Sequence, residues 1–350
     1  MIAGYMGWYG HKEIVIHDAL DGHRICRIDQ SERRKHILCC AFDPGNSLIA
    51  AGAEEYVKVW DISSRQRVFM ADADARVCAV GFLEGGDVIA AVNDKGEFRS
   101  WDLTSGRELV ETQLMLNENT EVSTISDGTF LPGGILLSGH GWGGVFDDQT
   151  LEIGNHIRKP GYYGRVAANS VGECCVLAPY TSWYREESIS LHVFAGHGRG
   201  MPKFVKRTVS TGIGSLAVSP DGFLVAIQGR YGEVRIYDTR GEKLTLAAKL
   251  PRSSDEIIGG AMAFTGAGGE LLIQRTVGAL DRYSVGLDGE IENAAQGGTD
   301  GRATGEPSPV VTGPSRSFES RLLVLKELFE SGVITEGEYK KRRQDILAEM

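Results

Sequence analysis

One three-residue pattern recurs along the chain and constrains its fold more than any other feature. It is an apolar or small residue, then a ring side chain, then Asp. The five copies are Ile16-His17-Asp18, Val59-Trp60-Asp61, Ser100-Trp101-Asp102, Val145-Phe146-Asp147 and Ile236-Tyr237-Asp238. The Asp residues of the first four copies lie 43, 41 and 45 residues apart, and the last gap of 91 residues equals two such steps. A structural unit of constant length is therefore repeated through most of the chain.

A repeat of about 40–45 residues is typical of one blade of four antiparallel strands in a β-propeller. The clearest copy has β-rich runs at 37–42, 48–52, 56–62 and 67–70, separated by turn residues. The Gly of the first turn precedes the Asp of the pattern by 16 residues in three copies, at Gly45, Gly86 and Gly222. We predict a mainly β fold over 1–295, a β-propeller of seven blades with six as the alternative.

The Trp-Asp strand ends and the turn Ser219-Pro220-Asp221-Gly222 resemble those of WD-repeat β-propellers, and the resemblance covers 1–295. The sequence departs from that family because Gly22-His23, Gly139-His140 and Gly196-His197 do not stand at a constant offset from the blades. A repeat architecture of this kind usually recognises partners on its surface.

The first repeat contains only three β-rich runs, at 2–6, 13–17 and 23–28, and lacks an innermost strand. A propeller ring that stays open leaves unpaired strand edges. Either a later segment supplies the strand, with 308–312 as the β-like candidate, or the start of the chain is truncated. The sequence leaves both alternatives open.

The composition changes at 296–317, which is rich in Gly, Pro and Ser and predicts a flexible linker. A helical hairpin is predicted to follow at 318–350. The first helix carries apolar residues at helical spacing, and Thr335 with Glu338 forms a capping box for the second. The predicted docking residues of the hairpin are Leu322, Leu325, Leu328, Phe329, Ile334, Tyr339, Ile346 and Leu347.

This hairpin, with Gly332-Val333-Ile334-Thr335 and Glu338 at its centre, resembles the short C-terminal domain called SHOCT. The resemblance covers 318–350 and implies a bacterial or phage protein with an oligomerisation or docking role. A hairpin of this size cannot bury a self-sufficient core, so its apolar stripe needs another surface. That surface belongs to the propeller, to another copy or to a second protein, and we expect a homo-oligomer.

A second candidate site lies within the repeats, where one unit is longer than the others. Its additional residues, 180–187, include Trp183, Tyr184 and Arg185. Aromatic and Arg side chains are enriched at protein interfaces, so we predict that these three bind a protein partner. Tyr162 and Tyr163, in the preceding connection, are predicted to extend the same patch.

No motif predicts a catalytic, cofactor or metal site. Gly139-x-Gly141-x-x-Gly144 has the letters of a dinucleotide fingerprint, but strand-like Val145-Phe146-Asp147 follows where a helix should begin. The six Cys residues lack the spacing of zinc ligands, and neither a Ser-His-Asp order nor Gly-x-Ser-x-Gly is present. The chain is therefore predicted not to be an enzyme.

Charge and hydropathy limit the partners further. The net charge of −10 argues against a dedicated nucleic-acid binder. No apolar run approaches the ~18 residues of a membrane span, and the first residues do not read as a signal peptide. We expect a cytoplasmic protein.

The leading interpretation is a non-enzymatic protein-interaction scaffold, with a partner on the propeller and docking or oligomerisation through the hairpin. The alternative is an enzyme or small-molecule sensor that uses the central channel of the propeller. That alternative depends on Arg76, Glu121, Arg165 and Glu256, which the sequence places at the starts of innermost strands.

Overall fold

The computed structural model divides the chain into two compact units, Met1–Asp300 and Gly301–Met350. The residues that the structure describes all lie in the first unit. They are 2–5, 13–18, 23–29, 36–117, 120–122, 124–140, 142–158, 162–169, 174–180, 187–195, 204–210, 213–229, 233–241, 245–250, 262–265, 269–274, 280–285 and 291–297. The predicted linker and hairpin, 296–317 and 318–350, lie outside them apart from 296 and 297.

The described residues form antiparallel sheets whose strands follow one another in chain order. The first sheet has three strands: β1 (Ile2–Tyr5), β2 (Glu13–His17) and β3 (Arg24–Asp29). The next two have four strands each: β4 (Cys39–Phe42), β5 (Leu48–Gly52), β6 (Tyr56–Asp61) and β7 (Arg67–Asp72), then β8 (Val77–Leu83), β9 (Val88–Asn93), β10 (Glu97–Asp102) and β11 (Glu108–Gln113). A short 3-10 helix, Glu84–Gly86, joins β8 to β9.

Four further four-stranded sheets follow. They are β14 (Ile125–Leu131), β15 (Gly134–Gly139), β16 (Trp142–Phe146) and β17 (Ile153–Arg158); β18 (Tyr162–Ala168), β19 (Cys174–Tyr180), β20 (Glu187–Ala195) and β21 (Phe204–Ser210); β22 (Ile213–Val218), β23 (Leu224–Gly229), β24 (Val234–Asp238) and β25 (Thr245–Leu250); and β26 (Met262–Phe264), β27 (Glu270–Gln274), β28 (Leu280–Val285) and β29 (Ile291–Gly297).

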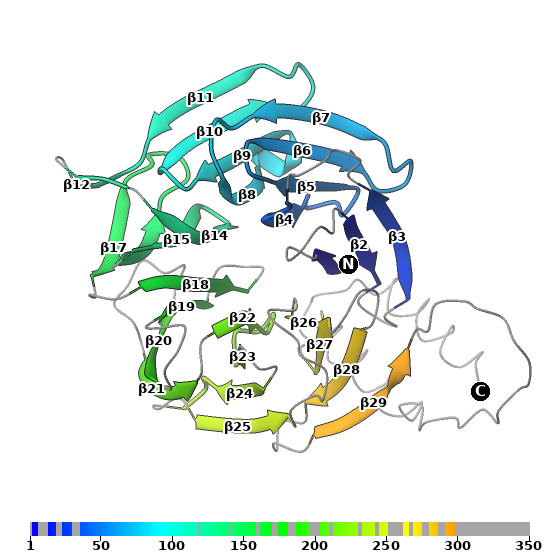
Figure 1. Cartoon of the computed structure of the whole chain (residues 1–350), viewed down its shortest axis with the longest axis vertical. Coiled ribbons are helices and arrows are strands. Elements are labelled where there is room, and N and C mark those ends of the chain that lie inside the picture. The colour runs from blue at the N-terminus through cyan, green and yellow to red at the C-terminus, as the bar shows by residue number, and fades with distance from the viewer. Residues whose placement is uncertain are drawn as a thin grey trace, which may run out of the picture. The chain divides into compact units, whose positions relative to one another are not determined.

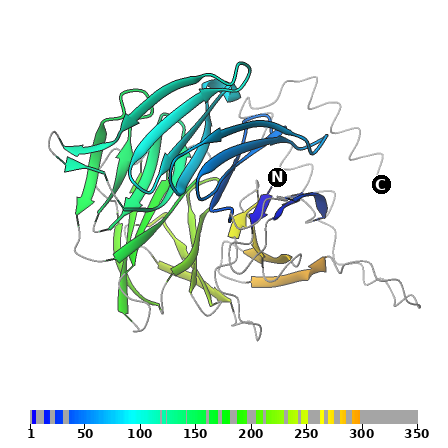
Figure 2. The same cartoon turned by 45° about the horizontal axis from the view of Figure 1, so that its top comes forward.

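The sheets are arranged as in a β-propeller. The first strands of consecutive four-stranded sheets contact one another in turn, from β4 to β8, β14, β18, β22 and β26. Figure 1 shows these strands nearest the middle of the unit, with β7, β11, β17, β21, β25 and β29 outermost. The view in Figure 2 shows the sheets standing face to face. The predicted mainly β fold is therefore confirmed.

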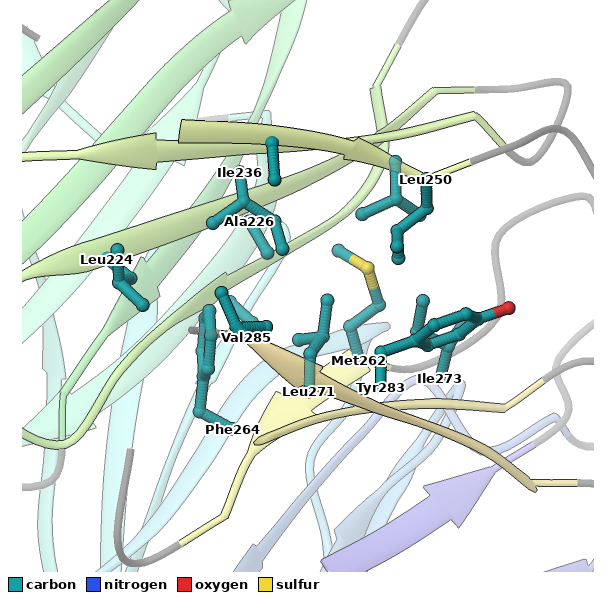
Figure 3. Close-up of a cluster of buried hydrophobic side chains, with 13 residues drawn as sticks. Leu224, Ala226, Ile236, Leu250, Met262, Phe264, Leu271, Ile273, Tyr283 and Val285 are labelled. Atoms are coloured by element: carbon teal, nitrogen blue, oxygen red, sulfur yellow. The ribbon is translucent and has the colours of Figure 1, made fainter. Parts of the chain in front are cut away.

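Neighbouring sheets are held together by apolar side chains on their facing sides. Figure 3 shows the largest of these clusters, where Leu224, Ala226 and Ile236 point from the β22–β25 sheet toward Leu271 and Val285 of the β26–β29 sheet. Further clusters join each pair of consecutive sheets from β1–β3 onward. Full burial of one such side chain contributes about 1.5–3 kcal/mol, so the seams between sheets supply most of the stabilising energy.

The recurring ring and Asp pattern belongs to these seams and to the turns beside them. Trp60, Trp101, Phe146 and Tyr237 are buried at the ends of the third strands of their sheets. Each following Asp accepts hydrogen bonds from its own turn. Asp61 Oδ1, for example, accepts the Ser64 N–H and the Ser63 hydroxyl, both at 2.7 Å. The ring of the pattern therefore packs in the core and its Asp stabilises the following turn, as predicted. The carboxylate oxygens are already engaged in these hydrogen bonds.

The innermost strands approach so closely that some positions admit only glycine. A Cβ on Gly81 of β8 would lie 2.3 Å from the Phe130 ring of β14. A Cβ on Gly128 of β14 would lie 2.8 Å from the Cβ of Ala79. These contacts join two sheets, so the missing side chain is what allows the neighbouring strand to pack.

Two features of the middle repeats are informative about the sequence predictions. Gly139 and Gly144 lie in the β15–β16 hairpin, where Gly139 pairs with Trp142, so the hairpin interpretation of the glycine motif is confirmed.

The structure also contains a two-stranded sheet that the repeat did not predict, β12 (Met115–Asn117) with β13 (Thr120–Glu121). It is an insertion between two repeat units and so has no counterpart in the period.

We expect Gly81→Ala to lower the free energy of unfolding by about 1–3 kcal/mol, because the added methyl must displace the Phe130 ring at a packed seam. Gly154→Ala is the matched control. Its Cβ would meet only the Val145 carbonyl oxygen, at 3.8 Å, so we expect a change within about 0.5 kcal/mol. Chemical denaturation of both variants measures the difference. Equal stability of the two would contradict the close packing of β8 against β14.

Candidate functional site

The described part of the predicted aromatic patch, Tyr162 and Tyr163, lies at one end of the β18–β21 sheet. Tyr162 and Tyr163 begin β18, and the strand register pairs Tyr162 with Tyr180, the last residue of β19. The segment that contains Trp183, Tyr184 and Arg185 starts directly after Tyr180 and lies outside the described residues. The structure thus places Tyr162 and Tyr163 at this sheet end, and the binding role of all five residues stays a prediction.

The docking residues predicted for the hairpin lie outside the described residues, and their role also stays a prediction. They are Leu322, Leu325, Leu328, Phe329, Ile334, Tyr339, Ile346 and Leu347. Nothing in the described part of the chain tests them.

A line of polar contacts connects the innermost strands of four consecutive sheets. The Cys39 thiol of β4 lies 3.7 Å from the Val77 carbonyl oxygen of β8. The Cys78 thiol of β8 donates to the Ile125 carbonyl oxygen of β14 at 3.2 Å. Cys78 lies at a β-bulge of β8 between Val77 and Ala79, which turns its side chain out of the regular alternation.

Asp127 of β14 makes the next connection in this line. Its Oδ2 accepts the Val166 N–H of β18 at 3.1 Å and lies 3.7 Å from the Arg165 guanidinium. Its Oδ1 accepts the N–H of Gly128, also at 3.1 Å. Burial raises the pKa of the Asp127 carboxyl, and the positive charge of Arg165 and the backbone hydrogen bonds only partly oppose that effect.

Asp127 is a site residue that the sequence analysis missed. Ser126-Asp127-Gly128 has the composition of a turn, yet all three residues lie inside β14, beside a bulge between Ile125 and Asp127. The available signal was the position of Asp127 near the start of a repeat unit. The burial of its carboxyl depends on β18, which the sequence pattern does not report.

The residues put forward for a channel site are only partly brought together. Arg165 lies on β18 next to Asp127, as an innermost-strand residue. Arg76 directly precedes β8, and its carbonyl oxygen accepts the Asp94 N–H at 2.7 Å. Glu121 is a correction, because it lies in β13 of the unpredicted hairpin and not at the start of an innermost strand. Glu256 lies outside the described residues.

The thiols near this line do not have the properties of reactive cysteines. Burial raises the pKa of Cys40 and of Cys78 to about 12, and it raises that of Cys39 well above its ordinary value of 9.0. A thiol with a raised pKa is protonated at neutral pH and is a poor nucleophile. Within the described ranges, no group of three or more His, Cys, Asp or Glu side chains is arranged to hold a metal ion.

No helix among the described residues is both long enough and apolar enough to span a bilayer.

Comparison with known proteins identifies one repeat directly. Residues 20–61 match the WD domain, G-beta repeat (WD40) family model. This segment runs from the start of β3 to the end of β6 and closes on Trp60-Asp61. The family's repeat therefore begins with the outermost strand of one sheet and ends with the third strand of the next.

Among curated proteins, the chain is 28% identical over 105 residues to the mouse U3 small nucleolar RNA-associated protein 4 homolog. The match covers 27% of this chain and 15% of the mouse protein, so the chain spans a small part of that relative.

Solved structures show the same fold. A chain of the mitotic checkpoint complex matches with a TM-score of 0.63 at 12% identity, covering 81% of this chain and 83% of that one. The Dos1 propeller matches with a TM-score of 0.57 at 15% identity, covering 78% of each chain. At these identities the likeness concerns the fold alone. The chain thus contains a WD40 repeat and has a β-propeller-like fold.

Asp127 and Asp61 contribute to the stability of the fold with opposite pH dependences. The pKa of Asp127 is raised from 3.8, so the folded protein holds this proton more tightly than the unfolded chain does. The stability that Asp127 contributes is therefore present below pH 3.8 and is lost as the pH rises through the raised pKa. Hydrogen bonds from Ser64 and Ser63 lower the pKa of Asp61 to about 2, so its contribution is present above 3.8 and is lost as the pH falls toward 2.

We expect the stability difference between the wild type and Asp127→Asn to become less favourable to the wild type as the pH rises from 3.8. For Asp61→Asn, the same difference should become more favourable to the wild type as the pH rises from about 2 to 3.8. The measurement is the free energy of unfolding from chemical denaturation at a series of pH values. A flat or rising difference for Asp127→Asn would contradict the burial of this carboxyl.

Proposed function

We propose that this chain, with its WD40 repeat and β-propeller-like fold, is a non-enzymatic protein-interaction scaffold. The observation that carries the proposal is the use of the repeated polar pattern by the fold itself. The Asp61, Asp102 and Asp238 carboxylates accept hydrogen bonds from their own turns, and these bonds lower the pKa of all three. The repeats therefore supply a rigid support, and recognition falls to the connections and outer strands that differ between units.

The first candidate recognition surface is the end of the β18–β21 sheet. The pairing of Tyr162 with Tyr180 supports it, because the first residues of β18 lie beside the start of the segment with Trp183, Tyr184 and Arg185. Large aromatic side chains and Arg provide most of the binding energy in many interfaces. We infer that this combined patch holds a protein partner.

The finer architecture belongs to the same proposal. We propose seven blades, formed by the six four-stranded sheets together with the three-stranded sheet of β1–β3. The segment 318–350 is proposed to form the SHOCT-like hairpin and to dock or oligomerise through its apolar stripe. Two or more propellers linked in this way would bind a multivalent partner with increased avidity.

One observation favours the second candidate function, an enzyme or small-molecule sensor that uses the innermost strands. Asp127 is a partly buried carboxyl beside Arg165, and perturbed carboxyls of this kind are enriched at functional sites. Both of its oxygens, however, already accept backbone hydrogen bonds from Gly128 and Val166. The Asp127 carboxylate thus connects two sheets and plays a structural role, so the scaffold is the better-supported function.

We expect removal of 296–350 to lower the solution mass to that of a monomer, because the apolar stripe that joins copies is lost. Light scattering after size-exclusion chromatography, on the full chain and on 1–295, measures this. The matched control is the full chain with Leu322→Ser and Leu325→Ser, which keeps the length and removes only apolar surface. If the full chain and both variants have the same number of subunits, the hairpin does not oligomerise the protein.

We expect Trp183→Ala combined with Tyr184→Ala to remove a partner that the wild type retains in a quantitative pull-down from native extract. Phe223→Ala is the control, since Phe223 is an exposed aromatic residue (47%) on a different sheet. Circular dichroism of the variants checks that the fold is intact. The site assignment fails if every retained protein is lost equally from both variants or from neither.

A further inference from the structure

Arg99 of β10 is the centre of a group of ion pairs at the seam between the β4–β7 and β8–β11 sheets. Its Nη2 atom lies 2.6 Å from Asp74 Oδ2, 2.9 Å from Glu97 Oε1 and 2.7 Å from Glu111 Oε1. Its Nε atom lies 3.9 Å from Glu108 Oε1. These are all the ion pairs that Arg99 forms with described residues, and we call the five residues the Arg99 cluster.

The Arg99 cluster connects two sheets. Asp74 follows the end of β7, whereas the other members of the cluster lie on β10 and β11, the strands next to it in Figure 1. Arg99 pairs with Glu111 in the strand register and lies on the same face of β10 as Trp101. On that face, Trp101 packs against Phe69 of β7, with ring centroids 6.2 Å apart. The contact of Arg99 with Asp74 is therefore an ionic link across the outer part of an apolar seam.

The carboxylates around Nη2 outnumber its hydrogens. A terminal guanidinium nitrogen carries two hydrogens, and Arg99 donates them to Glu97 and Glu111. Asp74 Oδ2 is the nearest of the three oxygens, yet it accepts neither hydrogen in this arrangement. Three carboxylates thus compete for two hydrogens, and the link to the neighbouring sheet is the one that goes without.

Neighbouring cations do not balance the four carboxylates of the cluster. Arg67 pairs with Trp60, which packs toward the β1–β3 sheet, so Arg67 lies on the other face of β7. Arg65 and Arg107 stand in the turns that precede β7 and β11, whereas the link between the sheets lies beyond the other end of β7. Lys95, in the turn before β10, is exposed and makes no ion pair with the described residues. The cluster therefore has an excess of negative charge when all its carboxyls are ionised.

The two carboxyls next to each other in the cluster respond to this excess in opposite ways. A hydrogen bond with Glu97 raises the pKa of Glu111. Burial by itself would raise the pKa of Glu97, but hydrogen bonds from Arg99 and Asn93 lower it below its ordinary value. Glu111 is thus the carboxyl that takes up a proton, and Glu97 accepts the hydrogen bond from it. A protonated Glu111 no longer needs a hydrogen from Arg99, which becomes available to Asp74.

We propose that the Arg99 cluster is a pH-sensitive link between the β4–β7 and β8–β11 sheets. With a proton on Glu111, Arg99 donates to Glu97 and Asp74 and ties the two sheets together. When that proton leaves, Glu111 competes again for a hydrogen of Arg99, and the link to Asp74 weakens. The outer part of this seam therefore responds to pH, while the apolar contact beneath it does not. The proposal is independent of the recognition surface on the β18–β21 sheet.

The pH range of the response follows from the signs of the two shifts. The pKa of Glu111 is raised from 4.5, so its contribution to stability is present below pH 4.5 and is lost as the pH rises through the raised pKa. The pKa of Glu97 is lowered from 4.5, so its contribution is present above that value and is lost as the pH falls through the lowered pKa. The link is therefore strongest near pH 4.5 and weaker at neutral pH.

The first test is carbon-13 NMR of the glutamate carboxyl groups in the full chain, titrated from about pH 3 to about pH 8. We expect Glu111 to titrate above 4.5. In Glu97→Gln the acceptor loses its charge, so the pKa of Glu111 should fall toward 4.5. Glu152→Gln is the matched control, because Glu152 is an exposed residue of another sheet, and it should leave the titration of Glu111 unchanged. A wild-type Glu111 that titrates at or below 4.5 overturns the proposal.

The second test measures the link itself by chemical denaturation of the wild type and Asp74→Asn. The variant should raise the unfolding equilibrium constant about two- to fivefold more at about pH 5 than at about pH 7.5, the size expected for an exposed ion pair. In a Glu111→Gln background the effect of Asp74→Asn should be the same at both pH values, because the amide donates to Glu97 and does not titrate. Circular dichroism checks that each variant is folded. An effect of Asp74→Asn that is independent of pH in the wild type, or that still depends on pH in the Glu111→Gln background, overturns the proposal.

Discussion

The structure depends on burial of apolar side chains between the faces of neighbouring sheets. A single four-stranded sheet of this chain would expose the apolar side chains of both faces to water. The neighbouring sheets bury those faces. Residues of β23 show how one strand serves two seams. Val225 and Ile227 pack toward β18–β21 in one cluster, while Leu224 and Ala226 pack toward β26–β29 in another. Strands buried on both faces then read as continuous apolar runs, and the repeat supplies one such sheet after another.

This packing decides where polar chemistry can be placed. At the innermost strands the sheets are so close that glycine is required at Gly81, and polar side chains must find partners on the next sheet. The Cys78 thiol and the Asp127 carboxylate do so by hydrogen bonding to backbone groups of β14 and β18. Such bonds compensate the free-energy cost of burying these polar groups. Their polar atoms are then already hydrogen-bonded within the fold and do not serve a ligand. Recognition is therefore favoured at sheet ends and outer edges.

The proposed recognition surface follows from this division. The end of the β18–β21 sheet differs from its neighbours because its unit is longer there. There the sequence departs from the repeat, while the described residues of the sheet keep their apolar contacts with both neighbouring sheets, so we expect this position to vary without loss of the fold.

The repeated unit, the antiparallel strands and most of their boundaries can be predicted from the sequence alone. Trp60, Trp101 and Tyr237 recur at a fixed distance from a turn glycine, and periodicity of this kind is local information. It also excluded the dinucleotide interpretation of Gly139 and Gly144, because the residues that follow have strand character. The β12–β13 hairpin and the channel role given to Glu121 could not be resolved in this way, since an insertion between units has no period. The contact of the partly buried Asp127 with β18 and the four carboxylates around Arg99 emerge only from the folded chain, because both depend on contacts between chain segments that sequence spacing does not encode.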